Sequence, residues 1–234
     1  MSEQHSPVVV EDLLQEATRR LVRAVDGLDD DAYAEPSGLP GWTRGHVLAH
    51  LTLNAEGLAG ALGGIVDVDR VPMYSSQEAR DGDIDELAAA RAPVIRDRLL
   101  GATTDLTDAL DALPDDQWDT AIERVPGGRT FAARDVPQMR LQEVEIHHAD
   151  LAAGYSRADW PDAFVVLLLD GLSEKGGDVS LHARATDLAR TWTFGARGPT
   201  VSGAGADLGW WLTGRGAGDG LTSDSGVLPQ IGTW

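Results

Sequence analysis

Apolar residues recur every three to four positions near the start of the chain and predict an amphipathic helix from about Val8 to Gly27. Ser6 followed by Pro7 is typical of a helix start, because serine caps the first turn and proline fits the first helical position. The predicted core stripe comprises Leu14, Ala17, Leu21, Val25 and Leu28. This helix is therefore expected to bury one face against other elements.

A second helix with the same period is expected from Thr43, which can cap it, to about Leu62. Gly63 and Gly64 are expected to end it, because glycine disfavours a helix interior. The following segment, residues 71–80, lacks a helical or strand period and is expected to be an irregular crossover.

A third helix is predicted over about residues 83–113, with a kink at Pro93. Residues 118–132 are expected to form a short hairpin that turns at two adjacent glycines. A fourth helix is expected over residues 138–153, which contain neither proline nor glycine. Four helices with a long second connection predict a four-helix bundle over residues 1–154.

The pattern changes after Gly154 and predicts a second, small α+β domain over residues 155–234, so that the fold class is α+β with two domains. Residues 161–171 are apolar and helical in pattern, and residues 206–212 are expected to form a short helix. The three strand-like runs are residues 178–184, 191–194 and 200–202. The aromatic residues expected in the core of this domain are Trp192, Phe194, Trp210 and Trp211.

Three side chains with metal-ligand chemistry fall on the apolar stripes of two predicted bundle helices. His50 lies in the middle of the stripe of the second helix. Glu143 and His147 are four residues apart on the fourth helix, so they share one helical face. Buried acids and imidazoles must be paired, neutralised or bound to a metal. The alternative is a buried His–Glu hydrogen bond without a metal, but three such residues in one bundle favour a His₂Glu metal site.

A site with three protein ligands keeps an open coordination position, which is the pattern of catalytic zinc. Zn²⁺ suits two imidazoles and one carboxylate best, although iron, nickel or manganese would also fit. The neighbouring histidines, His46 and His148, are spare candidates. His148 is rotated by about 100° from His147 and is interpreted as a residue for packing or for an interhelical hydrogen bond. Asp150 is either a hydrogen-bond acceptor for a ligand or a solvated acid near the helix end.

Composition narrows the choice of partners. The chain has 234 residues, a formal net charge of −19 and no cysteine. The negative charge argues against nucleic acid and membrane surfaces. The absence of a signal peptide and of a long apolar run predicts a cytoplasmic protein, which we expect to be a monomer. Any thiol chemistry requires a thiol from outside the chain, because the protein has none.

Two arginines are candidates for contacts with a ligand. Arg215 stands among glycines, which let a backbone approach a ligand closely, and its guanidinium can bind a carboxylate through two hydrogen bonds. Arg80 has the same chemistry. The alternative for both residues is an ordinary arginine in a surface loop.

These motifs together resemble one known family. They are Gly41-Trp42-Thr43-Arg44-Gly45-His46-Val47-Leu48-Ala49-His50, Pro72-Met73-Tyr74 with Glu78-Ala79-Arg80, Met139-Arg140 with Glu143-Val144 and Ile146-His147, Asp150-Leu151, and Gly214-Arg215-Gly216 with Asp219-Gly220. In this order along nearly the whole chain, they resemble the mycothiol-dependent maleylpyruvate isomerases. The bundle motifs are shared with the wider DinB-like metal-binding superfamily.

The resemblance implies that His50, Glu143 and His147 bind zinc, that Arg215 is catalytic and that mycothiol is the thiol cofactor, for which Arg80 is a candidate binding residue. It also implies that the small domain completes the active site. The implied reaction converts maleylpyruvate, a small dicarboxylate of gentisate-type aromatic catabolism, into fumarylpyruvate. The thiolate adds to C2, the C2–C3 bond rotates in the resulting enolate, and the thiol is expelled.

Two alternatives use the same residues. A mycothiol-dependent S-transferase would consume the thiol, whereas an isomerase regenerates it. A non-catalytic metal-binding protein would hold zinc and show no thiol-dependent reaction.

Overall fold

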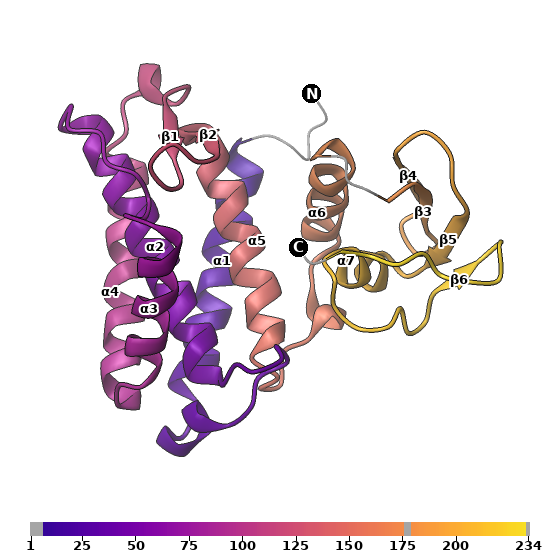
Figure 1. Ribbon diagram of the computed structural model, residues 1–234, viewed down its shortest axis with the longest axis horizontal. Coiled ribbons are helices and arrows are strands. Elements are labelled where there is room, and N and C mark those ends of the chain that lie inside the picture. The colour runs from indigo at the N-terminus through magenta and orange to yellow at the C-terminus, as the bar shows by residue number, and fades with distance from the viewer. Residues whose placement is uncertain (1–6, 176–178, 233–234) are drawn as a thin grey trace. The chain divides into compact units, whose positions relative to one another are not determined.

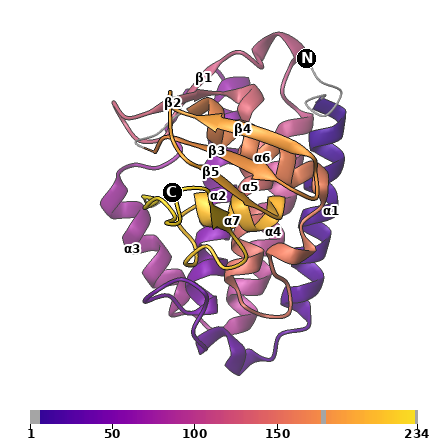
Figure 2. The same ribbon diagram turned by 90° about the vertical axis from the view of Figure 1, so that its right-hand side faces the viewer.

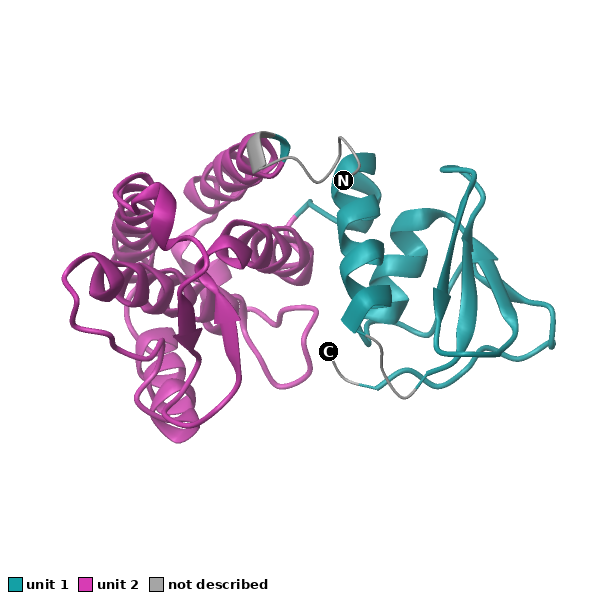
Figure 3. Ribbon diagram, turned by 90° about the horizontal axis from the view of Figure 1, so that it is seen from above, with its two compact units in different colours: residues 1–9, 154–234 teal, residues 10–153 magenta. Residues whose placement is uncertain are grey.

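The computed structural model describes residues 7–175 and 179–232. The chain divides into two compact units, one of residues 10–153 and one of residues 1–9 together with 154–234 (Figure 3). The first unit is mainly helical and the second combines helices with a sheet (Figure 1). The predicted α+β fold class is therefore confirmed. None of the described helices is long and apolar enough to cross a membrane.

Five helices build the unit of residues 10–153 (Figure 1). They are α1 Pro7–Asp26, α2 Arg44–Val66, α3 Gln77–Ala88, α4 Ala92–Asp111 and α5 Val136–Asp150. The strands β1 Ala121–Glu123 and β2 Thr130–Ala132 form the predicted antiparallel hairpin. Short 3-10 helices lie at Asp30–Ala34, Asp115–Gln117 and Ala133–Asp135. The first predicted helix is confirmed, but its expected cap, Ser6, lies outside the described residues.

Helix α2 is at the centre of this unit, because it contacts α3, α4 and α5. A helix surrounded in this way must be apolar on nearly every side. Its fully buried apolar residues include Val47, Leu48, Leu51, Leu58 and Leu62. Burial at this density limits where a polar side chain can be accommodated without a partner, so the polar residues of α2 are informative about function.

The second helix is longer than the sequence predicted, because Gly63 and Gly64 lie inside it and not at its end. Neither glycine has a positive φ. A Cβ atom at Gly64 would lie 2.6 Å from the carbonyl oxygen of Asp69. Gly64 is therefore explained by the close approach of the chain that follows the helix.

The prediction of one long third helix is wrong, because residues 83–111 belong to two helices, α3 and α4. Pro93 lies in the first turn of α4, where a missing backbone N–H is tolerated, so it starts a helix and does not kink one. The predicted crossover is shorter than expected. Ser76 caps α3 by accepting a hydrogen bond from the Ala79 N–H at 3.0 Å, so Arg80 is helical.

In its described residues, the second unit contains a four-stranded sheet of order β4-β3-β5-β6. Figure 2 shows β4, β3 and β5 side by side in this order. The strands are β3 Leu181–Ala185, β4 Arg190–Phe194, β5 Thr200–Gly203 and β6 Thr222–Ser223. β3 pairs antiparallel with β4 and parallel with β5, and β5 pairs antiparallel with β6. The helices are α6 Asp162–Lys175 and α7 Gly205–Leu212, preceded by a 3-10 helix at Arg157–Asp159.

The core of this unit follows the alternation of the strands. Leu181, Ala183 and Ala185 of β3 are fully buried, whereas Arg184 is exposed. The predicted strand began at Asp178, which lies outside the described residues. The other buried side chains of this core include Phe164, Leu168, Trp192, Phe194, Val201, Leu208 and Trp211. Trp210 differs from the prediction, since it is only partly buried.

Candidate metal centre

The loop before α2 and the start of that helix hold His50 in place. Thr43 caps α2 by accepting a hydrogen bond from the His46 N–H. The backbone N–H of Gly38 donates to the Asp150 carbonyl at 2.7 Å, which attaches this loop to the end of α5. The indole of Trp42 lies 5.8 Å from the His50 ring, measured between centroids. These contacts place His50 opposite α5 and leave the residue only 5% exposed.

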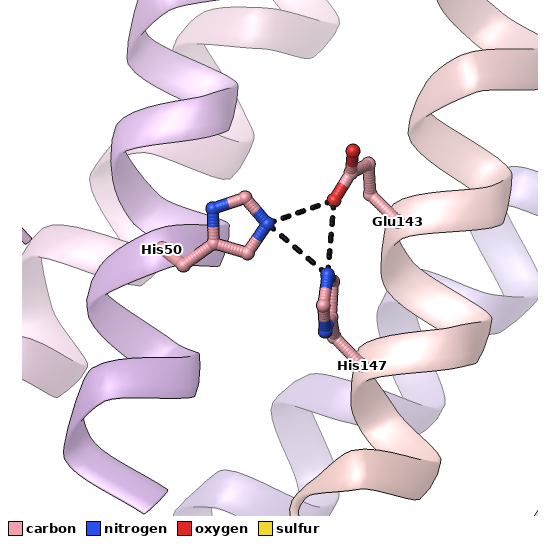
Figure 4. A group of neighbouring side chains, drawn as sticks. All are labelled: His50, Glu143 and His147. Carbon is pink, nitrogen blue, oxygen red and sulfur yellow. Dashed lines mark hydrogen bonds and ion pairs between the residues drawn. The ribbon is translucent and has the colours of Figure 1, made fainter. Parts of the chain in front are cut away.

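His50, Glu143 and His147 meet between α2 and α5 (Figure 4). The His50 Nε2 atom lies 2.9 Å from Glu143 Oε2 and 3.1 Å from His147 Nε2. His147 Nε2 lies 3.3 Å from the same Glu143 oxygen. All three donor atoms thus lie within 4.8 Å of one another. The structure therefore brings together the three residues that the sequence selected as candidate ligands.

Burial and mutual contact control the charges of this cluster. Burial lowers the pKa of His50 to about 4. Burial alone would raise the pKa of Glu143, but the neighbouring His50 and His147 hold it well below its usual value. For His147, hydrogen bonds from its ring to Asp150 and Glu143 outweigh burial and raise the pKa. Glu143 is therefore a carboxylate at neutral pH, and the cluster presents this anion together with two imidazole nitrogens.

Asp150 fixes the orientation of His147. The His147 Nδ1 atom lies 2.9 Å from Asp150 Oδ2, and Asp150 is 1% exposed. This hydrogen bond, one of the two roles that the sequence suggested for Asp150, is present. A carboxylate on Nδ1 keeps the proton there and leaves Nε2 as the nitrogen that can bind a metal.

Neither spare histidine belongs to the cluster. The His46 Nδ1 atom accepts a hydrogen bond from the Thr43 N–H at 3.2 Å, so His46 takes part in the cap of α2. Its Nε2 atom lies 3.7 Å from Asp85. His148 is 3% exposed, and its position next to His147 on an ideal helix turns it away from the three donors.

Two arginines contact the cluster or its helices. Arg80 Nη2 donates to His50 Nδ1 at 3.0 Å. Arg140 is 3% exposed, and its Nη1 donates to the Leu51 carbonyl at 2.8 Å and to Asn54 Oδ1 at 2.7 Å. Burial lowers the pKa of Arg140 to about 10, so it stays charged at neutral pH. Sequence reasoning missed this link from α5 to α2, although an arginine on the stripe of α5 was the available signal.

Arg215 lies in the other compact unit, just after α7. It stands between Gly214 and Gly216, which have φ values of 76° and 69°. Its Nη1 donates to the Thr213 carbonyl at 3.0 Å, and its guanidinium carbon lies 5.7 Å from the centroid of the Trp210 ring. The guanidinium is therefore held on an aromatic face by its own loop.

Donor atoms of two histidines and one glutamate, converging between two helices, fit a divalent metal of the zinc type. The fold and this cluster define a class of helical-bundle proteins with a candidate three-donor metal centre, followed by a small α+β unit. Residues 14–152 match the family described as the mycothiol maleylpyruvate isomerase N-terminal domain. Because the match covers more than half of the chain, the protein belongs to this family, and the predicted family of enzymes is confirmed.

Two solved structures are similar to this chain over their whole length. One is the mycothiol-dependent maleylpyruvate isomerase, with a TM-score of 0.89, 27% sequence identity and 100% of both chains covered. The other is a histidine-to-alanine mutant of a protein with that name, with a TM-score of 0.88, 26% identity and the same coverage. Comparison with curated proteins gave no significant match.

Proposed function

We propose that this protein is a zinc- and mycothiol-dependent isomerase that converts maleylpyruvate into fumarylpyruvate. The observation that carries the proposal is the convergence of His50, Glu143 and His147 within 4.8 Å, in a chain of this family. We assign the metal to these three residues, and we assign a catalytic role to Arg215. We also propose that the second unit completes the active site through Arg215.

The residues of the cluster have separable tasks in this proposal. His50 and His147 offer neutral nitrogen donors, and Glu143 offers the negative charge that offsets part of a dication's charge. Asp150 keeps His147 in the tautomer that binds through Nε2. A zinc ion held there would lower the pKa of a bound thiol, so that the thiol binds as thiolate.

The thiol must come from outside, because the chain has no cysteine. Mycothiol would supply a thiolate for addition to C2 of maleylpyruvate, with the π electrons of C2–C3 moving toward the C4 ketone. After rotation about C2–C3, the enolate electrons would re-form the double bond as the C–S bond breaks, which would release the trans isomer and the thiolate. Arg215 would bind a carboxylate or the oxygen on which negative charge develops. Arg80, which contacts His50, would bind a ligand beside the metal. The sequence analysis made Arg80 a candidate for binding the thiol cofactor.

The test is an ultraviolet assay of maleylpyruvate conversion by the zinc-loaded protein, with and without mycothiol. We expect conversion only with the thiol, and we expect the thiol concentration to be unchanged after many turnovers. Stoichiometric loss of the thiol would instead indicate an S-transferase. Bound zinc without any thiol-dependent reaction would indicate a metal-binding protein. Cytoplasmic location and a monomeric state stay predictions, the second of which light scattering can check.

Asp150 provides a smaller prediction about the metal. Asp150→Asn keeps an acceptor for the His147 Nδ1–H but removes the negative charge, so we expect zinc affinity to fall roughly 10- to 100-fold. Competition with a chromogenic chelator measures this change. Asp85→Asn is the matched control, since Asp85 is an exposed acid near His46, outside the cluster. Equal zinc affinity of wild type and Asp150→Asn would show that this hydrogen bond does not support the metal.

A further inference from the structure

A cavity of about 280 Å³ lies within the unit of residues 10–153, and one of its lining residues, Arg80, contacts His50 of the metal centre. Its walls come from α2, from the segment before α3, from α3 and from α4. Leu53, Glu56 and Gly57 contribute from α2, one to two turns beyond His50. This volume is close to the lower end of the range for small-molecule sites.

Arg80 joins this cavity to the metal centre, because it lines the cavity and also contacts His50. Its guanidinium carbon lies 5.7 Å from the centroid of the Tyr74 ring, which supports one face of the group. Nη1 donates to Asp81 at 2.7 Å, and Asp81 is mostly exposed. The Arg80 side chain itself is only 15% exposed. The guanidinium is thus held at a defined place.

One donor of this guanidinium has no acceptor. The Nε atom of Arg80 is buried and makes no hydrogen bond to any described part of the chain. A buried donor without an acceptor costs free energy, so such groups call for an explanation. A ligand carboxylate fits, because it accepts two parallel hydrogen bonds from one edge of a guanidinium.

The other charged groups on the cavity wall are either paired or exposed. Arg98 binds Glu56 through two hydrogen bonds of 2.7 and 2.8 Å. Asp83 is exposed. Arg80 is therefore the cationic group of the wall that can receive an anion without first breaking a bidentate ion pair.

Metal binding would release a second donor of the same group. A guanidinium has donors only, so its contact with His50 Nδ1 places the proton of the neutral imidazole on Nε2. A metal on Nε2 requires that proton on Nδ1 instead, where it would face the Arg80 N–H. The contact between Arg80 and His50 would therefore be lost in a metal-loaded site, and Nη2 would then need an acceptor as Nε does.

We propose that Arg80 binds a carboxylate of the substrate, with the cavity of α2, α3 and α4 as the subsite for that end of the molecule. This inference rests on the proposed function, because it takes the ligand to be a small dicarboxylate. In this proposal, Arg80 binds the substrate and not the thiol cofactor. The protein would then bind the substrate and the thiol through different residues near the metal.

The experiment is calorimetric titration of the zinc-loaded protein with maleate, a simple dicarboxylate, in the absence of thiol. Arg80→Gln should weaken maleate binding roughly 10- to 100-fold, the effect of losing charge-assisted hydrogen bonds to a carboxylate. Arg80→Lys should recover only part of the affinity, because lysine offers a point charge and no paired donors. Zinc content and the melting temperature of each variant are measured alongside.

Arg124→Gln is the matched control. The guanidinium carbon of Arg124 lies 5.5 Å from the centroid of the same Tyr74 ring, and its Nη1 donates a hydrogen bond to Gln77. Arg124 is not part of the cavity wall described above. We expect its maleate affinity to stay within about twofold of wild type. Equal maleate affinity of wild type and Arg80→Gln would overturn the proposal, and so would an equal loss in Arg124→Gln.

The outcomes also separate this inference from the proposed function. Arg80-dependent maleate binding in a protein that does not convert maleylpyruvate would support the subsite and contradict the isomerase assignment. Thiol-dependent conversion together with maleate binding that does not depend on Arg80 would support the isomerase assignment and contradict the subsite. Weaker mycothiol binding with unchanged maleate binding in Arg80→Gln would show that Arg80 contacts the cofactor and would overturn the proposal.

Discussion

Glu143→Ala is expected to abolish zinc binding and to lower turnover on the order of 1,000-fold. The variant keeps two histidine donors but loses the carboxylate that balances the charge of the dication. Activation of a nucleophile by a metal supplies several kcal/mol of transition-state stabilisation, which corresponds to a rate change of this order. Mass spectrometry of the metal content and the ultraviolet assay measure the two losses. His50→Ala and His147→Ala should behave in the same way.

His46→Ala and His148→Ala are the controls for the ligand assignment. Both remove a histidine adjacent to the centre, yet neither side chain belongs to the donor cluster. We expect about one zinc per chain in both variants, provided that circular dichroism shows a wild-type fold. Zinc retained by Glu143→Ala but lost from folded His148→Ala would contradict the assignment of Glu143 as a ligand.

Arg215→Ala is expected to lower kcat/KM roughly 30- to 1,000-fold while zinc content stays at the wild-type level. The estimate corresponds to about 2–4 kcal/mol for one charge-assisted contact that strengthens as negative charge develops. If the contact is stronger in the transition state than with bound substrate, kcat must fall as well as KM rise. Steady-state kinetics at saturating mycothiol separates the two parameters. Arg215→Lys should recover only part of the rate.

Arg184→Ala is the matched control for Arg215, since it removes an exposed arginine from β3 of the same unit. We expect kinetics within about twofold of wild type. A kcat/KM of Arg215→Ala close to that of wild type would contradict the catalytic role of this residue. Loss of zinc or of the folded state in Arg215→Ala would show that its effect is structural.

Much of the helical architecture and of the donor set could be predicted from local sequence. Glu143 and His147 share a face because helical geometry depends only on residues within one turn. His50 attracted attention because an imidazole in a continuous apolar stripe needs a partner. The β1–β2 hairpin and the strands β3, β4 and β5 followed from glycine turns and from alternation, which are also local, whereas the short strand β6 was not predicted.

The break between α3 and α4 could not be predicted in this way. The buried residues on its two sides, Ile84, Leu87, Ile95 and Leu99, keep a spacing that one continuous helix would also have. Local periodicity therefore does not reveal that three residues separate α3 from α4. Likewise, a glycine such as Gly64 is typical of a helix end. Its place inside α2 is explained by the close approach of Asp69, which only the folded chain brings near.

By itself, the sequence determined which side chains face the interior of each helix and, through its motifs, the family. Tertiary structure alone decided that His50 meets Glu143, that Arg80 reaches His50 from α3, and that Arg140 ties α5 to α2. The physical reason is that atoms some 30 to 90 positions apart meet only through the packing of whole helices. That packing depends on the shapes of many buried side chains at once, and no short motif records it.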